Sequence, residues 1–337
     1  MGCSESKQVQ ARQVSSPSKK DSHTAATTDD IKVNWALYRA LKQYRDNYFI
    51  GPDDVKAVTV LVSSNDMTTE VGFLNGQFVY LKSVASSADD QATARWSLMT
   101  EISSRASIHH PNIVGFKGFT IAPTKGLSCV TEYMEGGTLR SLLDDQQAFA
   151  KLTWAVEKIN FAIDICTALC CLHKDNPQLI DSNIQASKVL LNRDHTCAKL
   201  SGSQTFRGRR DERLFIGYAG EFGWTAPEAL LGDDVDSKGD VYSFGVLLTE
   251  LDTGLLLYAG IRDTTPLPLL MNKLVSKQLR LTLSPGCPEE IAKIVNLCIG
   301  HDPHIRPSSD RVLEMLQNAK IQLNSLTKES VVEFCPP

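Results

Sequence analysis

The sequence lacks any apolar run of the roughly 18 residues that a membrane-spanning helix needs. It also lacks an excess of charge of one sign, because 35 basic residues stand against 39 acidic ones, for a net charge of -4. We therefore expect neither a transmembrane segment nor a general affinity for nucleic acid. The length of 337 residues exceeds the usual size of one hydrophobic core, and predicts one large two-lobed domain or two small ones.

No secretory leader precedes the nine cysteines, which are odd in number and scattered through apolar stretches such as DICTALCCL. This usage is typical of reduced thiols in a cytosolic protein and not of a disulfide framework. Cys166 and Cys170 lie one helical turn apart, but no second ligand pair accompanies them. We therefore expect them to pack in a helix, and we expect no metal site.

The first residues carry a pattern for covalent lipid attachment. MGCSES fits M-G-x-x-x-[ST], with Gly2 as the myristoyl acceptor and Cys3 beside it as a palmitoyl acceptor. Because one myristoyl chain holds a membrane only marginally, a second lipid is needed for residence. We expect a protein tethered to the cytoplasmic face of a membrane, the plasma membrane. The alternative is a solvated polar tail, since residues 1–30 have almost no core-forming side chains.

The body of the chain changes character once. Up to residue 134, β-branched and aromatic runs alternate with polar turns around one helical stretch, as a small antiparallel sheet requires. After Gly136 and Gly137 the pattern becomes mostly helical. The predicted fold is α+β, with a small antiparallel β lobe followed by a larger α-helical lobe. The predicted boundaries are 1–30 for a disordered tether, 31–50 for a leading helix, 51–134 for the first lobe, 135–320 for the second and 321–337 for a C-terminal tail.

Several short strings occur in a defined order along this body. VYLK contains Lys82, a helical stretch before IHHPNIV contains Glu101, and VTEYMEGGTL contains Thr131 and Met134. Further on come WTAPEAL, DVYSFGVLLTEL and HDPHIRPS. The ordered set resembles the protein kinase family, in particular its tyrosine-kinase-like branch, over about residues 50–320, and implies a two-lobed protein-kinase-like fold.

The resemblance assigns roles to these positions. It places Lys82 on the third strand and Glu101 on the helix that follows, and makes Thr131 the gatekeeper and Met134 the hinge donor. It implies a buried ion pair between Glu228 and Arg306, a supporting role for Asp240 on a central helix, and a nucleotide cleft. The cleft positions are Tyr80, Lys82, Glu101, Thr131, Met134 and Leu190.

The catalytic positions of the family hold other residues here. Ser64, Asp66 and Thr69 stand where three glycines would cover phosphate, and Asp66 adds a repelling charge. The remaining departures involve proton transfer and metal binding. Asp181, Ser182 and Asn183 replace H-R-D, Gln185 replaces the catalytic-loop lysine, Lys188 replaces the metal-binding asparagine, and Gly202, Ser203 and Gln204 replace D-F-G.

Two further expectations concern the interior of the cleft. Tyr80 replaces the alanine that roofs the adenine pocket, so its ring is expected to fill that slot. The resemblance also places Arg105, Phe116, Ser203 and Asp181 in one stack between the lobes. We therefore hypothesise a salt bridge between Arg105 and Asp181, the alternative being that both side chains turn to solvent.

The segment after Gly202 carries four arginines, Arg207, Arg209, Arg210 and Arg213. Thr205 and Tyr218 are its candidate phosphate acceptors. An arginine cluster binds phosphate where it is ordered, and otherwise such a run is a solvated loop.

The expected function is that of a catalytically inactive pseudokinase. It would act as a scaffold or allosteric regulator, with other kinases or signalling proteins as partners and without a cofactor. Two alternatives stay open. One is an unusual active serine/threonine or tyrosine kinase that uses ATP and Mg²⁺, and the other is a nucleotide sensor without catalysis.

Overall fold

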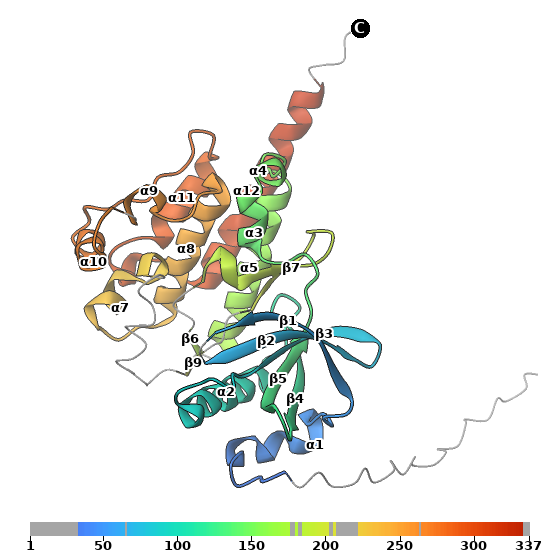
Figure 1. The fold of residues 1–337 in the computed structure, drawn as a ribbon. Coiled ribbons are helices and arrows are strands. Elements are labelled where there is room, and N and C mark those ends of the chain that lie inside the picture. The colour runs from blue at the N-terminus through green and yellow to red at the C-terminus, as the bar shows by residue number, and fades with distance from the viewer. Residues whose placement is uncertain are drawn as a thin grey trace, which may run out of the picture.

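The two predicted lobes are present in the order that the sequence patterns give (Figure 1). The first lobe is built on a five-stranded antiparallel sheet and the second is mainly helical, as the predicted α+β, kinase-like architecture requires. The computed structural model describes residues 33–64, 66–175, 179–180, 184–201, 205–206, 222–262 and 264–332.

The strands of the first lobe follow the β-branched runs of the sequence, and their order in the sheet is β1-β2-β3-β5-β4. The helix α2 begins where Asp90 accepts a hydrogen bond from the amide of Thr93, which satisfies one of the free N–H groups of its first turn. The bounds are β1 (Val55–Ser63), β2 (Met67–Leu74), β3 (Gln77–Val84), α2 (Gln91–Ala106), β4 (Phe116–Ala122) and β5 (Gly126–Glu132).

The segment expected as a leading helix is largely a 3-10 helix. It forms η1 (Arg39–Tyr44) and one α-helical turn, α1 (Arg45–Tyr48). Its large side chains recur every third residue, at Trp35 and Tyr38 in the turns that precede η1 and at Leu41 and Tyr44 within it. Three residues per turn bring such positions onto one side, whereas an α-helix would spread them around its axis. We call residues 33–50 the leader segment.

The leader segment packs on α2 and on the end of the sheet (Figure 1). Leu41 is fully buried and belongs to the same apolar cluster as Leu98 and Ile102 of α2 and Phe119 of β4. The hydroxyl of Tyr48 donates to the carbonyl of Ala106 at 3.3 Å, at the C-terminal end of α2. The segment therefore holds α2 along its outer side.

A glycine in β4 makes this contact possible. Gly118 lies at a register shift of the ladder, with φ at +149°, and a Cβ built there would come within 2.3 Å of the carbonyl oxygen of Tyr48. Only glycine leaves room for the backbone of the leader at that distance.

The second lobe contains the helices that the sequence predicts after the glycine pair. Two short antiparallel ladders, β6 with β9 and β7 with β8, lie next to the boundary between the lobes. Their bounds are β6 (Leu179–Ile180), β7 (Val189–Leu191), β8 (Ala198–Leu200) and β9 (Thr205–Phe206). The helices are α3 (Leu139–Asp144), α4 (Gln146–Phe149), α5 (Glu157–Asp175), η2 (Ala186–Lys188), η3 (Phe222–Trp224), α7 (Pro227–Leu231), α8 (Ser237–Thr253), α9 (Ala259–Arg262), α10 (Leu267–Val275), α11 (Glu289–Cys298), η4 (Pro303–Ile305) and α12 (Ser309–Val332).

Part of the segment assigned to a C-terminal tail is helical. The residues from 321 to Val332 continue α12, and Figure 1 shows this end of the helix projecting beyond its neighbours. The helix continues because the sequence IQLNSLTKESVV contains neither glycine nor proline to end it. No helix among the described residues combines the length and the apolarity that crossing a bilayer would demand.

The predicted ion pair between Glu228 and Arg306 is present and bidentate. Arg306 Nη1 lies 2.6 Å from Glu228 Oε1, and Nη2 lies 2.8 Å from Oε2. The guanidinium is fully buried and also stacks over the ring of Tyr242, 5.0 Å from its centroid. The pair therefore fixes α7 to the turn before α12, and this is a role in architecture.

The lobes join at a tight approach of two backbones. A Cβ built on Gly136 would lie 2.2 Å from the carbonyl oxygen of Asn192, and the amide of Gly136 donates to the carbonyl of Leu191 at 3.0 Å. Beside this join, Glu132 accepts hydrogen bonds from the amide of Gly115 and from Lys199 Nζ, both at 2.7 Å. The last residue of β5 is thus tied to both lobes.

Replacement of Leu41 by alanine should destabilise the fold by about 2–5 kcal/mol, because it leaves a cavity between the leader and α2. Leu37→Ala is the matched control, since that side chain is 51% exposed and its loss should change stability by no more than about 0.5 kcal/mol. Urea denaturation of the three proteins measures the difference. Equal stability of Leu41→Ala and the parent would contradict the packing of the leader.

Candidate functional site

The strand register shows which residues of the first-lobe sheet share the face that carries Lys82. Tyr80 lies opposite Val71 on β2 and Thr131 on β5, and Lys82 lies opposite Thr69 and Cys129. Because side chains two residues apart on a strand share a face, Tyr80 and Lys82 point to the same side. The gatekeeper and the aromatic residue predicted to fill the adenine slot are therefore direct cross-strand neighbours. Tyr80 is half-buried.

An ion pair connects this sheet to α2. Lys82 Nζ lies 2.7 Å from Glu101 Oε2. The other carboxylate oxygen of Glu101 accepts from Arg105 Nε at 2.9 Å, one helical turn further along α2. The Glu101 carboxylate is thus shared by two cations.

The two cations determine the protonation state of Glu101. Burial alone would raise the pKa of this carboxyl, but the charges of Arg105 and Lys82 outweigh that effect and lower the pKa to about 2. Glu101 is therefore ionised throughout the physiological range. The same site raises the pKa of the Cys129 thiol to about 12, chiefly by burial and then by the charge of Glu101, so this cysteine stays a neutral thiol.

Arg105 also connects α2 to the second lobe. Its Nη2 donates to the carbonyl of Ser201 at 2.9 Å, directly before the position of the lost D-F-G triplet. Asp181 and Ser203, the other members of the predicted stack, lie outside the described residues, so the hypothesis of an Arg105–Asp181 salt bridge stays a prediction. The ring of the fourth member, Phe116, packs against that of Tyr48, with 5.1 Å between their centroids and 47° between their planes.

The catalytic-loop positions are described in part. Gln185, at the catalytic lysine position, is buried, and Lys188, at the metal-binding asparagine position, is half-buried. The carbonyl of Lys188 accepts from the amide and the hydroxyl of Ser201 at 2.8 and 2.9 Å. Asn183 and Gly202, at the positions of the catalytic and metal-binding aspartates, lie outside the described residues.

The glycine-loop positions form a short hairpin between β1 and β2. The hydroxyl of Ser64 donates to the carbonyl of Met67 and accepts from its amide, both at 3.0 Å, and the carbonyl of Asp66 accepts from the amide of Ala85 at 2.8 Å. Thr69 lies inside β2, where its hydroxyl donates to the carbonyl of Val62 at 3.2 Å. At two of the three positions where the family has glycine, Ser64 and Thr69, a side-chain hydroxyl therefore forms hydrogen bonds within the hairpin.

The remaining cleft positions lie at the join of the lobes. Met134 is buried after β5, and its carbonyl accepts from the amide of Gly137 at 3.4 Å. Leu190 is half-buried on β7, pairs with Lys199 and forms a bridge to Thr138. The predicted cleft residues therefore come from both lobes and from the connection between them.

The two positions that the family resemblance assigns to metal binding have no oxygen ligand in their side chains. Mg²⁺ prefers oxygen ligands, and Lys188 offers an ammonium group at one of the two metal positions. Glycine at the other, Gly202, has no ligand atom in its side chain. Within the part of the chain that the structure describes, no group of three His, Cys, Asp or Glu side chains could hold a metal ion.

Sequence reasoning missed the polar contacts that support this region from α8. Asp240 was assigned to this helix, but its partner His173 of α5 was not, and the imidazole Nε2 lies 3.0 Å from Asp240 Oδ2. Glu250 was missed altogether. It is buried, and its Oε2 accepts from the amide of Ala186 at 3.1 Å and from Trp224 Nε1 at 2.8 Å.

A signal for Glu250 was present in the sequence. A single glutamate inside the apolar run SFGVLLTEL requires a buried partner, and here Arg140 Nη1 lies 3.2 Å from its second oxygen. Burial raises the pKa of Glu250, while the hydrogen bonds from Ala186 and Trp224 and the charge of Arg140 oppose that shift. The identity of the donors could not have been read from local spacing, because they come from three distant segments.

Comparison with known proteins agrees with this geometry. A family model described as protein tyrosine and serine/threonine kinase matches residues 67–316. The RasGEF domain-containing serine/threonine-protein kinase X of Dictyostelium discoideum is 30% identical over 247 residues, which cover 71% of this chain and 24% of that protein. The dual specificity protein kinase shkA of the same organism is 30% identical over 291 residues, covering 82% and 51%.

A plant relative gives the same result. MDIS1-interacting receptor like kinase 2 of Arabidopsis thaliana is 30% identical over 236 residues, covering 68% of this chain and 22% of that protein. The chain thus spans less than two thirds of the length of each of these relatives, and their similarity concerns one domain. The family match, the two-lobed fold and the Lys82–Glu101 and Glu228–Arg306 pairs lead to one conclusion: the chain belongs to the protein tyrosine and serine/threonine kinase family.

Proposed function

We propose that this chain is a pseudokinase, a kinase-family protein that binds partners and does not transfer phosphate. The observation that carries the proposal is the residue set at the catalytic positions, where Lys188, Gly202 and Asn183 stand in place of the two metal-holding groups and the proton acceptor. Glu101 is held by Lys82 on one carboxylate oxygen and by Arg105 on the other. The position of α2 against the sheet is then fixed by the protein's own charges. In a kinase the corresponding lysine–glutamate pair places the lysine on the phosphates of ATP; without the metal-holding groups, the pair here would have an architectural role alone.

The sequence of the cleft supports the same proposal. Phosphoryl transfer by this fold relies on positioning and on metal-assisted neutralisation of phosphate charge. Lys188 and Gly202 replace the two metal-holding groups, and Asn183 replaces the carboxylate that would accept the proton of the substrate hydroxyl. The ring of Tyr80 would occupy the volume that adenine needs. Each departure removes a separate part of the reaction.

A scaffold or allosteric role requires that the two lobes keep one relative position, so that partners meet the same surface. Arg105 links α2 to Ser201, and Glu132 links β5 to Gly115 and Lys199, so polar contacts from two elements of the first lobe hold residues 199–201 of the second. Such a domain would offer partner kinases or other signalling proteins one arrangement of α2 and the second lobe. The lipid-modified N-terminus, at Gly2 and Cys3, would place this surface at the cytoplasmic face of the plasma membrane.

One observation favours the alternative of an active kinase. The lysine–glutamate pair that catalysis by this fold needs is assembled, with 2.7 Å between Lys82 Nζ and Glu101 Oε2. Relatives over the same region are named as kinases. A nucleotide sensor without catalysis would use the same cleft without the metal.

Thermal unfolding with ATP, with and without Mg²⁺, separates the three functions. A nucleotide present at about 100 times its Kd would stabilise the folded state by about 2.7 kcal/mol. We expect no shift of Tm for the parent chain, and no phosphate incorporation into a protein substrate.

Tyr80→Ala is the informative variant in this experiment, because it opens the adenine slot and leaves Lys82 in place. It should gain a nucleotide-dependent shift that is independent of Mg²⁺. A Mg²⁺-dependent shift of the parent chain, with phosphate transfer that Lys82→Met abolishes, would establish the active kinase instead. A shift of the parent with ATP alone would establish the sensor.

Glu101→Gln should destabilise the domain by about 3–5 kcal/mol at neutral pH, with or without nucleotide, because it leaves Lys82 and Arg105 without their shared anion. Since the folded pKa of about 2 lies below the ordinary value of 4.5, the stabilisation is present above about pH 4.5 and is lost as the pH falls toward 2. The gap between parent and variant should therefore close in acid. Glu314→Gln, at an exposed pair with Arg311, is the control and should leave urea denaturation nearly unchanged at every pH.

Gly2→Ala should move the protein from the membrane to the supernatant fraction in cells that acylate their proteins, because the myristoyl acceptor is lost. Cys3→Ser should leave a single lipid and give partial, reversible binding. Ser4→Ala, at a position that the acylation pattern leaves open, is the control and should stay with the membrane. Membrane association unchanged by Gly2→Ala would refute the lipid anchor.

A further inference from the structure

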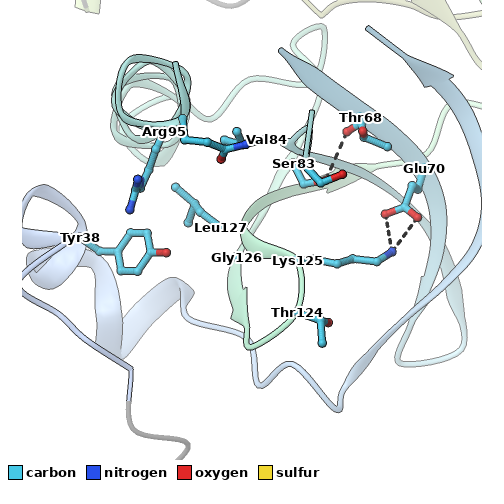
Figure 2. A pocket seen from close by; sticks show the side chains of 12 residues that line it. Tyr38, Thr68, Glu70, Ser83, Val84, Arg95, Thr124, Lys125, Gly126 and Leu127 are labelled. Atoms are coloured by element: carbon cyan, nitrogen blue, oxygen red, sulfur yellow. Dashed lines mark hydrogen bonds and ion pairs between the residues drawn. The ribbon is translucent and has the colours of Figure 1, made fainter. Parts of the chain in front are cut away.

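A pocket of about 430 Å³ lies on the first lobe, and none of its lining residues is a predicted cleft residue (Figure 2). Its walls come from five places in the chain: the leader segment, β2, the end of β3, the first turns of α2, and the turn between β4 and β5. The family model matches from residue 67 onward, so the leader's contribution comes from residues before that match. The pocket is therefore partly built by residues that precede the matched region.

Tyr38 supplies the leader's wall. Its side chain is more than nine-tenths buried, with 8% exposed, and Figure 2 shows its hydroxyl directed into the pocket. A Cβ built on Gly126, in the β4–β5 turn, would lie 4.0 Å from this oxygen. The hydroxyl has no hydrogen-bond partner among the residues that the structure describes, and its oxygen is accessible from the pocket, so it is free to donate to a ligand there.

Arg95 of α2 supplies a charge beside this hydroxyl. It is half-buried and extends from the helix toward Tyr38 (Figure 2). No described carboxylate lies within 4.0 Å of its guanidinium. The other charged pair of the pocket is satisfied internally, since Lys125 Nζ lies 2.7 and 2.8 Å from the two carboxylate oxygens of Glu70. Two cations and one anion line the pocket, so one positive charge, that of Arg95, is left unbalanced.

Two other polar side chains that line the pocket already form hydrogen bonds within the protein. Gln91 Nε2 donates to the carbonyl of Ala85 at 2.6 Å, and the hydroxyl of Ser83 donates to the carbonyl of Thr68 at 3.4 Å. Between them the pocket has an apolar floor of Val84 and Leu127, which belong to the cluster beneath α2. What the pocket offers a ligand is a guanidinium, a phenol hydroxyl and a compact apolar surface.

We propose that this pocket binds an organic anion, a phosphate monoester or a carboxylate joined to a compact apolar group. The guanidinium of Arg95 would pair with the anion, since a planar fork of N–H donors matches phosphate and carboxylate oxygens. The hydroxyl of Tyr38 would donate to a second oxygen of the same group, and the apolar part would lie on Val84 and Leu127. The volume fits such a ligand, because sites for small molecules measure about 300–1,000 Å³.

Occupation would link the leader segment to α2 through Tyr38 and Arg95. The same helix carries Glu101, so the pocket lies on the element that the shared carboxylate fixes. The proposal concerns a site apart from the nucleotide cleft, and holds whether or not the chain is a pseudokinase.

The test is a titration of the full chain with phenyl phosphate, phenylacetate, inorganic phosphate and benzyl alcohol, followed by amide chemical shifts. Phenyl phosphate or phenylacetate should move the backbone amide of Gly126 and the side-chain amide of Gln91 with saturation, and the tighter of the two identifies the anion. Inorganic phosphate and benzyl alcohol should each bind at least about tenfold more weakly, since each lacks one half of the recognition.

Three variants locate the binding. Arg95→Gln should weaken phenyl phosphate at least about tenfold, because it removes the charge, and Tyr38→Phe should weaken it severalfold while keeping the ring. Arg280→Gln removes an exposed arginine of the second lobe and should leave the affinity unchanged. Equal affinity of the parent and Arg95→Gln, saturation by inorganic phosphate alone at the same Kd, or absence of saturable shifts at Gly126 would each overturn the proposal.

Discussion

The arrangement of this protein depends on one carboxylate that two cations share. Glu101 lies between Lys82 of the sheet and Arg105 of its own helix, and Arg105 continues the connection to Ser201 in the second lobe. A buried ion pair need not add net stability, but it penalises every arrangement that separates its charges. Here three charges and one backbone carbonyl must stay together. The position of α2 is thereby determined without any ligand.

A second constraint acts on the opposite side of α2. The leader segment covers the outer face of the helix, with Leu41 buried against it and Tyr48 bonded to its C-terminal end. The helix is thus held by charge on the cleft side and by apolar packing on the outer side. The packing also brings Tyr38 to the wall of the pocket that Arg95 lines, so the element that stabilises α2 also forms part of the proposed binding site.

The fold and most of the cleft could be predicted because their signals are local in the sequence. Lys82, Glu101, Thr131, Glu228 and Arg306 occur in short strings whose order alone indicates the kinase family. The leader was harder to predict, because side chains at every third residue fit a 3-10 helix as well as a poorly formed α-helix. The partner of Arg105 was harder still, since a guanidinium with several donors can reach a carboxylate on its own helix and a distant carbonyl alike.

By itself, the sequence determined which chemical groups are present: a lysine and a glutamate for one ion pair, no carboxylate at either metal position, a tyrosine in the adenine slot and an acylation pattern at the start. These are properties of residue identity at defined positions, and folding does not change them. Only the tertiary structure decided that Glu101 serves two cations, that Glu250 gathers donors from three segments, and that Tyr38 and Arg95 face one pocket. Such contacts join residues far apart in the chain, and their distances are set by how the helices and the sheet pack and not by local spacing.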